Sequence, residues 1–242
     1  RDAWSYNFSQ QEIKNNIQTL IKTFNQELSK NNTFDLAEKN PKLIKWSSSL
    51  ENHFKKNKQI YFDENQIVKS LYRPFTIQYL YREKMLVHRY GQMHEIFPDE
   101  LSSNKVICVS GIGVKGGFTA LMSNIITDIN LLGGSTQCFP LYIYKEKTNS
   151  LPLFSISNQS KNLSKEFGIT NFGFEYLQKH FNDQSLSEED LFYYIYGLLH
   201  SPEYITKYSN NLSKELPRIP IVSKKEDFIS FAEAGRKLSD LH

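Results

Sequence analysis

The residues best suited to chemistry are cations and side-chain amides set among aromatic residues between positions 69 and 115. Arginine and lysine bind phosphate groups, arginine also pairs with guanine, and glutamine or asparagine can read the edge of adenine. For any single residue a structural role is the better interpretation, so the prediction of nucleic-acid contact rests on the whole set. The candidates are Lys69, Arg73, Gln78, Arg82, Lys84, Arg89, Gln92, Asn104 and Lys115.

Arg73 differs from the other candidates because Pro74 follows it directly. Proline cannot donate a ladder hydrogen bond, so it marks a strand end or a bulge. We therefore expect Arg73 to bind a backbone carbonyl or a carboxylate of the protein rather than a base.

The charge of the chain is uneven. Residues 45–89 hold nine basic and four acidic residues, whereas residues 151–242 hold ten basic and twelve acidic ones. A basic zone next to a mildly acidic one is consistent with a phosphate-binding face. Charge alone, however, favours an ordinary solvated surface rich in lysine.

A glycine pattern raises the alternative of nucleotide binding. Residues 111–116 match G-x-G-x-x-G and follow the strand-like run 106–110. A dinucleotide site would require a helix next, whose N-terminus meets the phosphates. The residues that follow are short for a helix and lead into the β-like run 125–127, so we expect a hairpin or a wide glycine turn between two strands.

Signatures of a complete catalytic centre are absent from the sequence. The chain has no Gly-Lys-Ser/Thr of a P-loop, no Pro-Pro of an adenine methyltransferase motif, and no Asp/Glu-x-Lys after Pro98-Asp99. His88 and His94 lie six residues apart without a neighbouring cysteine or paired carboxylate, which argues against a zinc site. We therefore expect no catalytic and no metal-binding residue in this chain.

The helices and strands expected around the candidate residues indicate an α+β fold. Ser9 and Glu12 form the capping-box pattern that starts a helix over residues 9–30, and a short helix is expected over 48–56. Strand-like runs occupy 59–62, 67–72, 76–82, 105–110, 118–122 and 137–144. A polar connector over 145–164 precedes helices at 172–181, 187–200, 201–215 and 225–242. We predict a helix with a mixed or antiparallel sheet in residues 1–150 and a helical C-terminal subdomain in 151–242.

Composition excludes several classes of protein. With 242 residues and 39% hydrophobic residues, the chain can build a core and is not disordered. No apolar run approaches the roughly 20 residues of a membrane span, and the N-terminus lacks the apolar stretch of a secretory signal. Cys108 and Cys138 suit reduced, buried thiols, so we expect a cytoplasmic protein. Because the chain starts at Arg1, we expect a fragment of a longer polypeptide or a processed chain.

Several strings resemble the C-terminal specificity region of type ISP restriction–modification enzymes. Tyr72-Arg73-Pro74-Phe75, followed by Tyr79-Leu80-Tyr81, looks like the segment after the methyltransferase core of that family. The strings occur in the expected order over nearly the whole chain, whereas the glycine stretch and residues 149–165 depart from the family pattern. The other matching strings are 1–8, 106–111, 138–142, 192–204, 216–220 and 238–242.

This resemblance implies sequence-specific binding of double-stranded DNA for a bacterial defence enzyme. In that family one polypeptide joins a nuclease, a helicase-like ATPase motor, a coupling region and an adenine-N6 methyltransferase to this target-recognition region. S-adenosylmethionine, ATP and Mg would be bound upstream, the methyltransferase domain would be a partner, and this fragment would be no enzyme itself. We expect the base-reading residues within 78–115. The alternatives are a module that docks the methyltransferase to its neighbours and a nucleotide-binding enzyme module.

Overall fold

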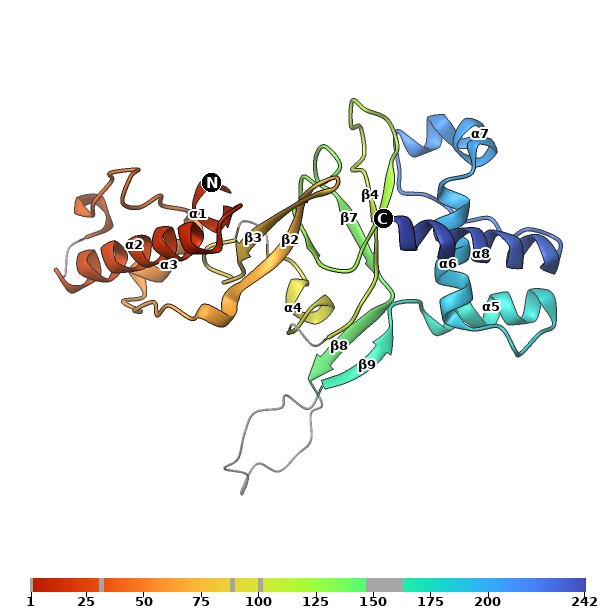
Figure 1. Ribbon diagram of the computed structural model, residues 1–242, viewed down its shortest axis with the longest axis horizontal. Helices are drawn as coiled ribbons and strands as arrows, with labels where there is room; N and C mark the ends of the chain where they lie inside the picture. Colours follow the sequence, from red (N-terminus) through yellow and green to blue (C-terminus); the bar gives the residue numbers. More distant parts are fainter. Residues whose placement is uncertain (1, 31–32, 88–89, 100–101, 147–162) are drawn as a thin grey trace, which may run out of the picture. The chain divides into compact units, whose positions relative to one another are not determined.

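The computed structural model describes residues 2–30, 33–87, 90–99, 102–146 and 163–242 (Figure 1). The chain divides into two compact units, and each has its own hydrophobic core. The first unit comprises Arg1–Tyr72 and Thr76–Gly91, and the second comprises Arg73–Phe75 and Gln92–His242. An N-terminal helix, small sheets and a helical C-terminal part confirm the predicted α+β class.

The first unit is built on helix α2 (Gln10–Ser29), which confirms the predicted helix over 9–30. The Ser9 hydroxyl accepts the Glu12 N–H at 3.2 Å, as an N-cap should. The Ser9 N–H donates to Asn7 Oδ1 at 2.9 Å, so half of the predicted capping box is replaced by a contact to the preceding strand. The apolar stripe of α2 is buried at Ile13, Ile17, Leu20, Ile21, Phe24 and Leu28.

Aromatic rings close the core beneath α2. Phe24 contacts Trp46 at a centroid distance of 5.6 Å and Phe54 at 5.8 Å. Phe54 lies on α3 (Ser48–Lys55), which confirms the predicted short helix. The smaller elements of this unit are α1 (Asp2–Ser5), η1 (Phe34–Leu36) and η2 (Glu64–Gln66).

Three strands complete the first unit: β1 (Tyr6–Asn7), β2 (Ile67–Arg73) and β3 (Thr76–Tyr81). β3 lies between the other two, and β1 pairs with it in antiparallel fashion, with Tyr6 opposite Leu80. Pro74 and Phe75 connect β2 to β3, and Phe75 adopts a left-handed φ of 59°. Strands 67–72 and 76–82 are thereby confirmed to within a residue or two.

The expected strand at 59–62 is wrong, because these residues form no strand. The backbone of Ile60 bonds to a side chain of α2 instead: its N–H donates to Asn25 Oδ1 at 3.0 Å and its carbonyl accepts the Asn25 amide at 2.7 Å. Phe62 stacks on Tyr81. The aromatic, β-favouring composition of this run therefore serves packing against the core rather than a ladder.

The second unit contains a three-stranded antiparallel sheet in the order β5-β4-β7. The strands are β4 (Val106–Val109), β5 (Ala120–Ser123) and β7 (Gln137–Pro140). Cys108 on β4 lies opposite Leu121 on one side and Cys138 on the other. All residues of β4 and β5 are buried, so both faces of these two strands are covered by other parts of the protein.

The predicted strand over 137–144 is interrupted at Leu141. It becomes β7 and then β8 (Tyr142–Glu146), which pairs with β9 (Leu163–Phe167) in a separate antiparallel ribbon. The start of β9 lies inside the polar connector predicted over 145–164. Leu163–Phe167 is short and carries two charges, so its sequence does not indicate a strand. The remaining short elements are β6 (Ile126–Thr127) and α4 (Met93–Ile96), and α4 was not predicted.

Four helices follow and confirm the predicted helical C-terminal part. They are α5 (Asn171–Phe181), α6 (Glu188–Leu199), α7 (Pro202–Leu212) and α8 (Lys225–Leu241). Figure 1 shows α6 and α8 crossing in this unit. Two glycines meet at the crossing, Gly197 on α6 and Gly235 on α8, and neither has room for a Cβ atom.

Within the described ranges, no helix is long and apolar enough to cross a lipid bilayer.

Candidate nucleic-acid interface

Four of the proposed contact residues belong to the first unit and lie on the β2–β3 hairpin or directly after it. Lys69 is exposed on β2 and Gln78 is half-buried on β3. Arg82 follows β3, and its N–H donates to the Gln66 carbonyl at 2.8 Å, which fixes the backbone at the strand end. Lys84 is exposed in the turn that comes next. The hairpin thus presents cations on a backbone held by hydrogen bonds, as a surface for phosphate binding requires.

Arg73 is the last residue of β2 but is grouped with the second unit, and it binds a carboxylate of the protein, one of the two predicted partners. Its guanidinium donates to Asp128 Oδ1 at 2.7 Å. The Asp128 side chain is only 7% exposed, and the same oxygen accepts the Asn130 N–H at 2.9 Å. Arg73 therefore neutralises a buried carboxylate that shapes the loop after β6, which a base contact would disrupt.

Asn104 is buried, and its side-chain amide is fully engaged inside the protein. The amide group donates to the carbonyls of Ile96 (2.9 Å) and Tyr142 (2.7 Å). Its oxygen accepts the N–H groups of Lys105 (2.9 Å) and Tyr142 (3.0 Å). These four bonds use both donors and both lone pairs of the amide. Asn104 thus joins α4 to β8 and has no group left for a base.

Two further candidates are exposed in the second unit, and one lies outside the described residues. Gln92 precedes α4, and its amide donates to Glu95 at 3.4 Å, a long contact that DNA could replace. Lys115 is exposed in the loop between β4 and β5. Arg89 falls outside the described residues. The described candidates are thus divided between the two units, four in the first and four in the second.

The glycine pattern forms a hairpin connection, as the sequence favoured. β4 and β5 pair in antiparallel register, with Val109 opposite Ala120, and residues 110–119 connect them. Gly113 and Gly117 have positive φ angles of 74° and 79°, which favour glycine. A strand follows the loop, so the helix that a dinucleotide fingerprint requires is not formed by these residues.

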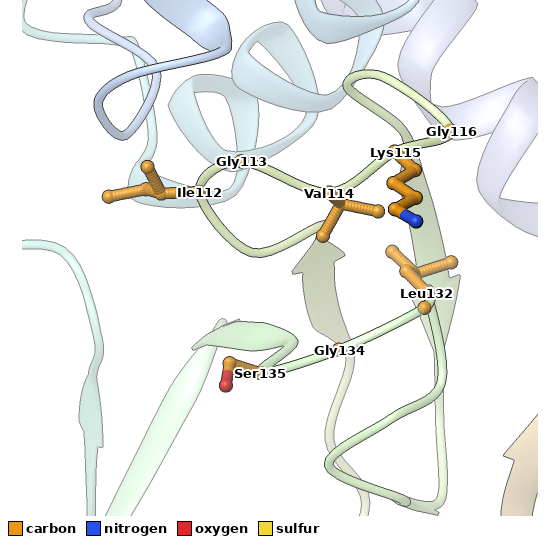
Figure 2. A pocket seen from close by; sticks show the side chains of 9 residues that line it. Ile112, Gly113, Val114, Lys115, Gly116, Leu132, Gly134 and Ser135 are labelled. Carbon is orange, nitrogen blue, oxygen red and sulfur yellow. The ribbon is translucent and has the colours of Figure 1, made fainter.

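This loop faces a second glycine-containing loop across a hollow. Figure 2 shows Lys115 and Val114 on the first loop and Leu132, Gly134 and Ser135 on the other. The space between them has a volume of about 630 Å³. Nothing in the sequence reveals that these two glycine-containing loops face each other, because they are separated along the chain.

The two cysteines lie side by side as free thiols, with their sulfur atoms 3.8 Å apart. Cys108 is buried, which agrees with the prediction, whereas Cys138 is only half-buried. The hydrogen bond between them lowers the pKa of Cys138 to about 7, and the same bond, together with burial, raises that of Cys108. No cluster of three or more His, Cys, Asp or Glu that could hold a metal occurs in the described part of the chain.

At the contact between α6 and α8, charged residues take part in helix packing. Arg236 on α8 donates to Asp190 on α6 at 2.7 Å and lies 4.4 Å from the Tyr193 ring. Burial alone would raise the pKa of Asp190, but hydrogen bonds from Ser187 and Arg236 outweigh it and lower that pKa. These contacts hold α6 against α8, so the charges are engaged within the protein rather than presented to DNA.

A family model described as the Type ISP C-terminal specificity domain matches residues 1–242. The chain belongs to this family. A comparison with curated proteins gave no match. The match covers the first unit as well as the second, so the β2–β3 hairpin and the two glycine loops are both parts of one specificity domain.

Solved structures similar to this specificity domain contain DNA. The cryo-EM structure of the DrdV–DNA complex is 32% identical, with a TM-score of 0.85. A nuclease-deletion mutant of the Type ISP restriction-modification enzyme LlaGI, in complex with a DNA substrate mimic, is 32% identical with a TM-score of 0.81. The ATP-dependent Type ISP enzyme LlaBIII bound to DNA is 33% identical with a TM-score of 0.82. Each match covers 100% of this chain but only 22%, 21% and 15% of the respective relative.

Proposed function

We propose that this specificity domain recognises a target sequence in double-stranded DNA on behalf of a larger restriction–modification enzyme. The observation that carries the proposal is the similarity of the whole chain, at 32–33% identity, to three structures that contain DNA. The excess of five positive charges in residues 45–89 supports it, because phosphate contacts supply most of the affinity for DNA.

The proposed DNA contacts are the exposed or half-buried members of the predicted set. Arg73 and Asn104 are left out, because an ion pair and four hydrogen bonds engage their side chains within the protein. We assign target recognition to residues 1–150, with the base readers within 78–115, and packing to residues 151–242. The contacts that we propose are Lys69, Gln78, Arg82, Lys84, Gln92 and Lys115, together with Arg89.

We further propose that the parent enzyme transfers a methyl group to adenine N6 and cleaves DNA in an ATP-dependent reaction in the cytoplasm. Its methyltransferase domain would bind S-adenosylmethionine, and its motor and nuclease would use ATP and Mg. The description of LlaBIII as ATP-dependent supports the motor. The fragment would hold no cofactor and catalyse no reaction, since the sequence lacks the P-loop, methyltransferase and nuclease signatures named above.

The proposal is tested by exchanging residues 78–115 for the matching stretch of a relative with a different target, followed by methylome sequencing. A changed methylation target supports the assignment of the readers. A target that changes only when residues 151–242 are exchanged places the reading surface in the other part. Binding of the purified protein to duplex DNA should also weaken as salt rises, with a slope near −0.9 per phosphate contact, and a flat salt dependence contradicts the proposal.

A docking role is a second candidate, and one surface feature favours it. Phe172 and Tyr176 lie four residues apart on α5, on one helical face, and are 81% and 57% exposed. Large exposed aromatic residues are enriched where proteins bind one another. If Phe172→Ser weakens association with the methyltransferase domain and leaves duplex binding unchanged, the domain has both roles.

A further inference from the structure

The two glycine loops of the second unit form a hollow that is lined by one of the proposed DNA contacts, Lys115. The first glycine loop comprises residues 111–117, between β4 and β5, and the second comprises residues 132–135, before β7. They face each other across about 630 Å³ (Figure 2). The lining residues are Ile112, Gly113, Val114, Lys115, Gly116, Leu132, Gly133, Gly134 and Ser135.

Close contacts hold the two loops in a fixed relation. A Cβ atom on Gly111 would lie 2.5 Å from the Gly134 carbonyl oxygen, so the two backbones touch there. The Gly113 N–H donates to the Ser213 carbonyl at 3.2 Å, which ties the first loop to the end of α7. The Thr136 hydroxyl accepts the Leu132 N–H at 3.0 Å and anchors the second loop. The hollow therefore exists before any ligand arrives, which reduces the entropy lost on binding.

The chemistry of the hollow suits an anion. Lys115 is the one charged residue among the nine that line it, and Figure 2 shows its side chain extending from the first loop toward Leu132 on the second. Within the described part of the chain, the backbone N–H groups of Lys115, Gly116, Gly134 and Ser135 donate to no protein acceptor. Backbone N–H groups of glycine-rich turns bind anions, and here they accompany an ammonium group and no carboxylate.

Glycine also keeps the hollow open to a bulky ligand. Cβ atoms added to Gly113, Gly116 or Gly134 would meet no heavy atom within 4 Å, so their backbones border open space. Gly134 has a φ of 137°, a conformation that L side chains rarely adopt. A ligand can therefore approach the main chain directly, as phosphate groups do at glycine-rich loops.

We propose that this hollow binds a backbone phosphate of the DNA duplex, with the Lys115 ammonium and the unpaired N–H groups of both loops as donors. This inference rests on the proposed function, because the phosphate belongs to the DNA that the domain recognises. A free nucleotide would offer the same phosphate chemistry. The duplex is favoured because β5, not a helix, follows the first loop, so no helix N-terminus is added to the site.

The test compares Lys115→Gln with Lys179→Gln in the intact protein. Lys179 is an exposed lysine on α5 that does not line the hollow. Fluorescence anisotropy measures affinity for a target duplex and an unrelated duplex from about 50 to 200 mM salt. Lys115→Gln should weaken both duplexes about tenfold and make the salt slope about 0.9 less steep, whereas Lys179→Gln should change neither. Ser135→Asp, which adds a negative charge to the second loop, should weaken both duplexes further, with an unchanged thermal midpoint as the control for folding.

The opposite outcomes are distinct. If the wild-type protein binds duplex DNA but Lys115→Gln leaves affinity and slope unchanged, the inference is overturned and the proposed function stands. If Lys115→Gln alters discrimination at one base pair only, the residue reads a base and the phosphate assignment is overturned. If ATP binds at this hollow and duplex DNA does not displace it, the hollow binds a nucleotide phosphate and the assignment to DNA is overturned. Failure of the wild-type protein to bind any duplex at low salt overturns the proposed function and this inference together.

Discussion

Gly197 on α6 and Gly235 on α8 bring the backbones of two helices into direct contact. A Cβ atom on Gly235 would lie 2.9 Å from the Gly197 nitrogen and 2.0 Å from the Tyr193 carbonyl oxygen. Real side chains do not tolerate such distances, so the crossing requires glycine on both helices. The same crossing carries the Arg236–Asp190 ion pair, which would lose its geometry if the helices moved apart.

Gly235→Ala should therefore destabilise the second unit even though alanine favours helices. We expect a loss of about 1–3 kcal/mol in the free energy of unfolding, because an added methyl group must push packed backbone apart. Urea denaturation followed by circular dichroism measures the change. Ala234→Ser, at the exposed neighbouring position on the same helix, is the control and should shift stability by less than about 0.5 kcal/mol. A stabilised Gly235→Ala variant would show that the helices do not cross in this way.

Loss of the Arg73–Asp128 ion pair should reduce stability without changing the DNA target. Arg73→Ala leaves the Asp128 carboxylate nearly buried and unneutralised, and we expect a cost of about 1–3 kcal/mol, discounted because the arginine is partly exposed. Asp128→Asn keeps the shape of the side chain and should cost less. Thermal unfolding measures the first effect and methylome sequencing the second. A new methylation target in the Arg73→Ala enzyme would contradict the structural role.

Asn104→Ala should behave as a core substitution. It removes four hydrogen bonds and leaves two partly buried carbonyl groups and two N–H groups of neighbouring residues without their partner. Leaving a polar group unsatisfied costs about 1–3 kcal/mol where water cannot replace the partner. Because these four groups are only partly buried, water replaces some of the partners, and a total of roughly 2–4 kcal/mol is expected. The measurement is urea denaturation, with Gln92→Ala as an exposed amide control. A stable Asn104→Ala variant with altered base preference would return Asn104 to the list of readers.

His200 should make the stability of the second unit depend on pH. Its Nε2 atom is buried and has no hydrogen-bond partner among the described residues. Burial, with a smaller effect of nearby His242, lowers its pKa below the ordinary 6.5. The unfolded chain therefore binds a proton at a higher pH than the folded one. Stability from this group is complete above pH 6.5 and declines as pH falls from there toward the lowered folded-state pKa.

The variant His200→Phe should flatten part of this decline. The loss of stability at low pH will not vanish, because burial also lowers the pKa of His242 and is the largest cause of the lowered pKa of His53. Urea midpoints measured from pH 7.5 to pH 5 in the wild-type and variant proteins give the comparison. Equal pH slopes in the two proteins would contradict a buried, neutral His200.

The sequence by itself determined the periodic elements. Helix α2 follows from a capping serine and a regular apolar stripe, and the hairpin at residues 110–119 follows from glycines between two apolar runs. Such signals are local, because they depend on residues within a few turns of each other. The family resemblance likewise came from short strings in a fixed order, and the Pro74 constraint predicted that Arg73 would bind a backbone carbonyl or a carboxylate, of which the structure shows the carboxylate of Asp128.

Tertiary structure decided everything that depends on distant partners. Only folding shows that Asn104 is saturated by Ile96 and Tyr142, and that Asn25 takes the backbone bonds of Ile60. Likewise, the first and second glycine loops are separated by residues 118–131 yet line one hollow. Burial and hydrogen-bond saturation are properties of the packed chain, so a polar residue type alone cannot distinguish a buried connector from a group that is free to meet DNA.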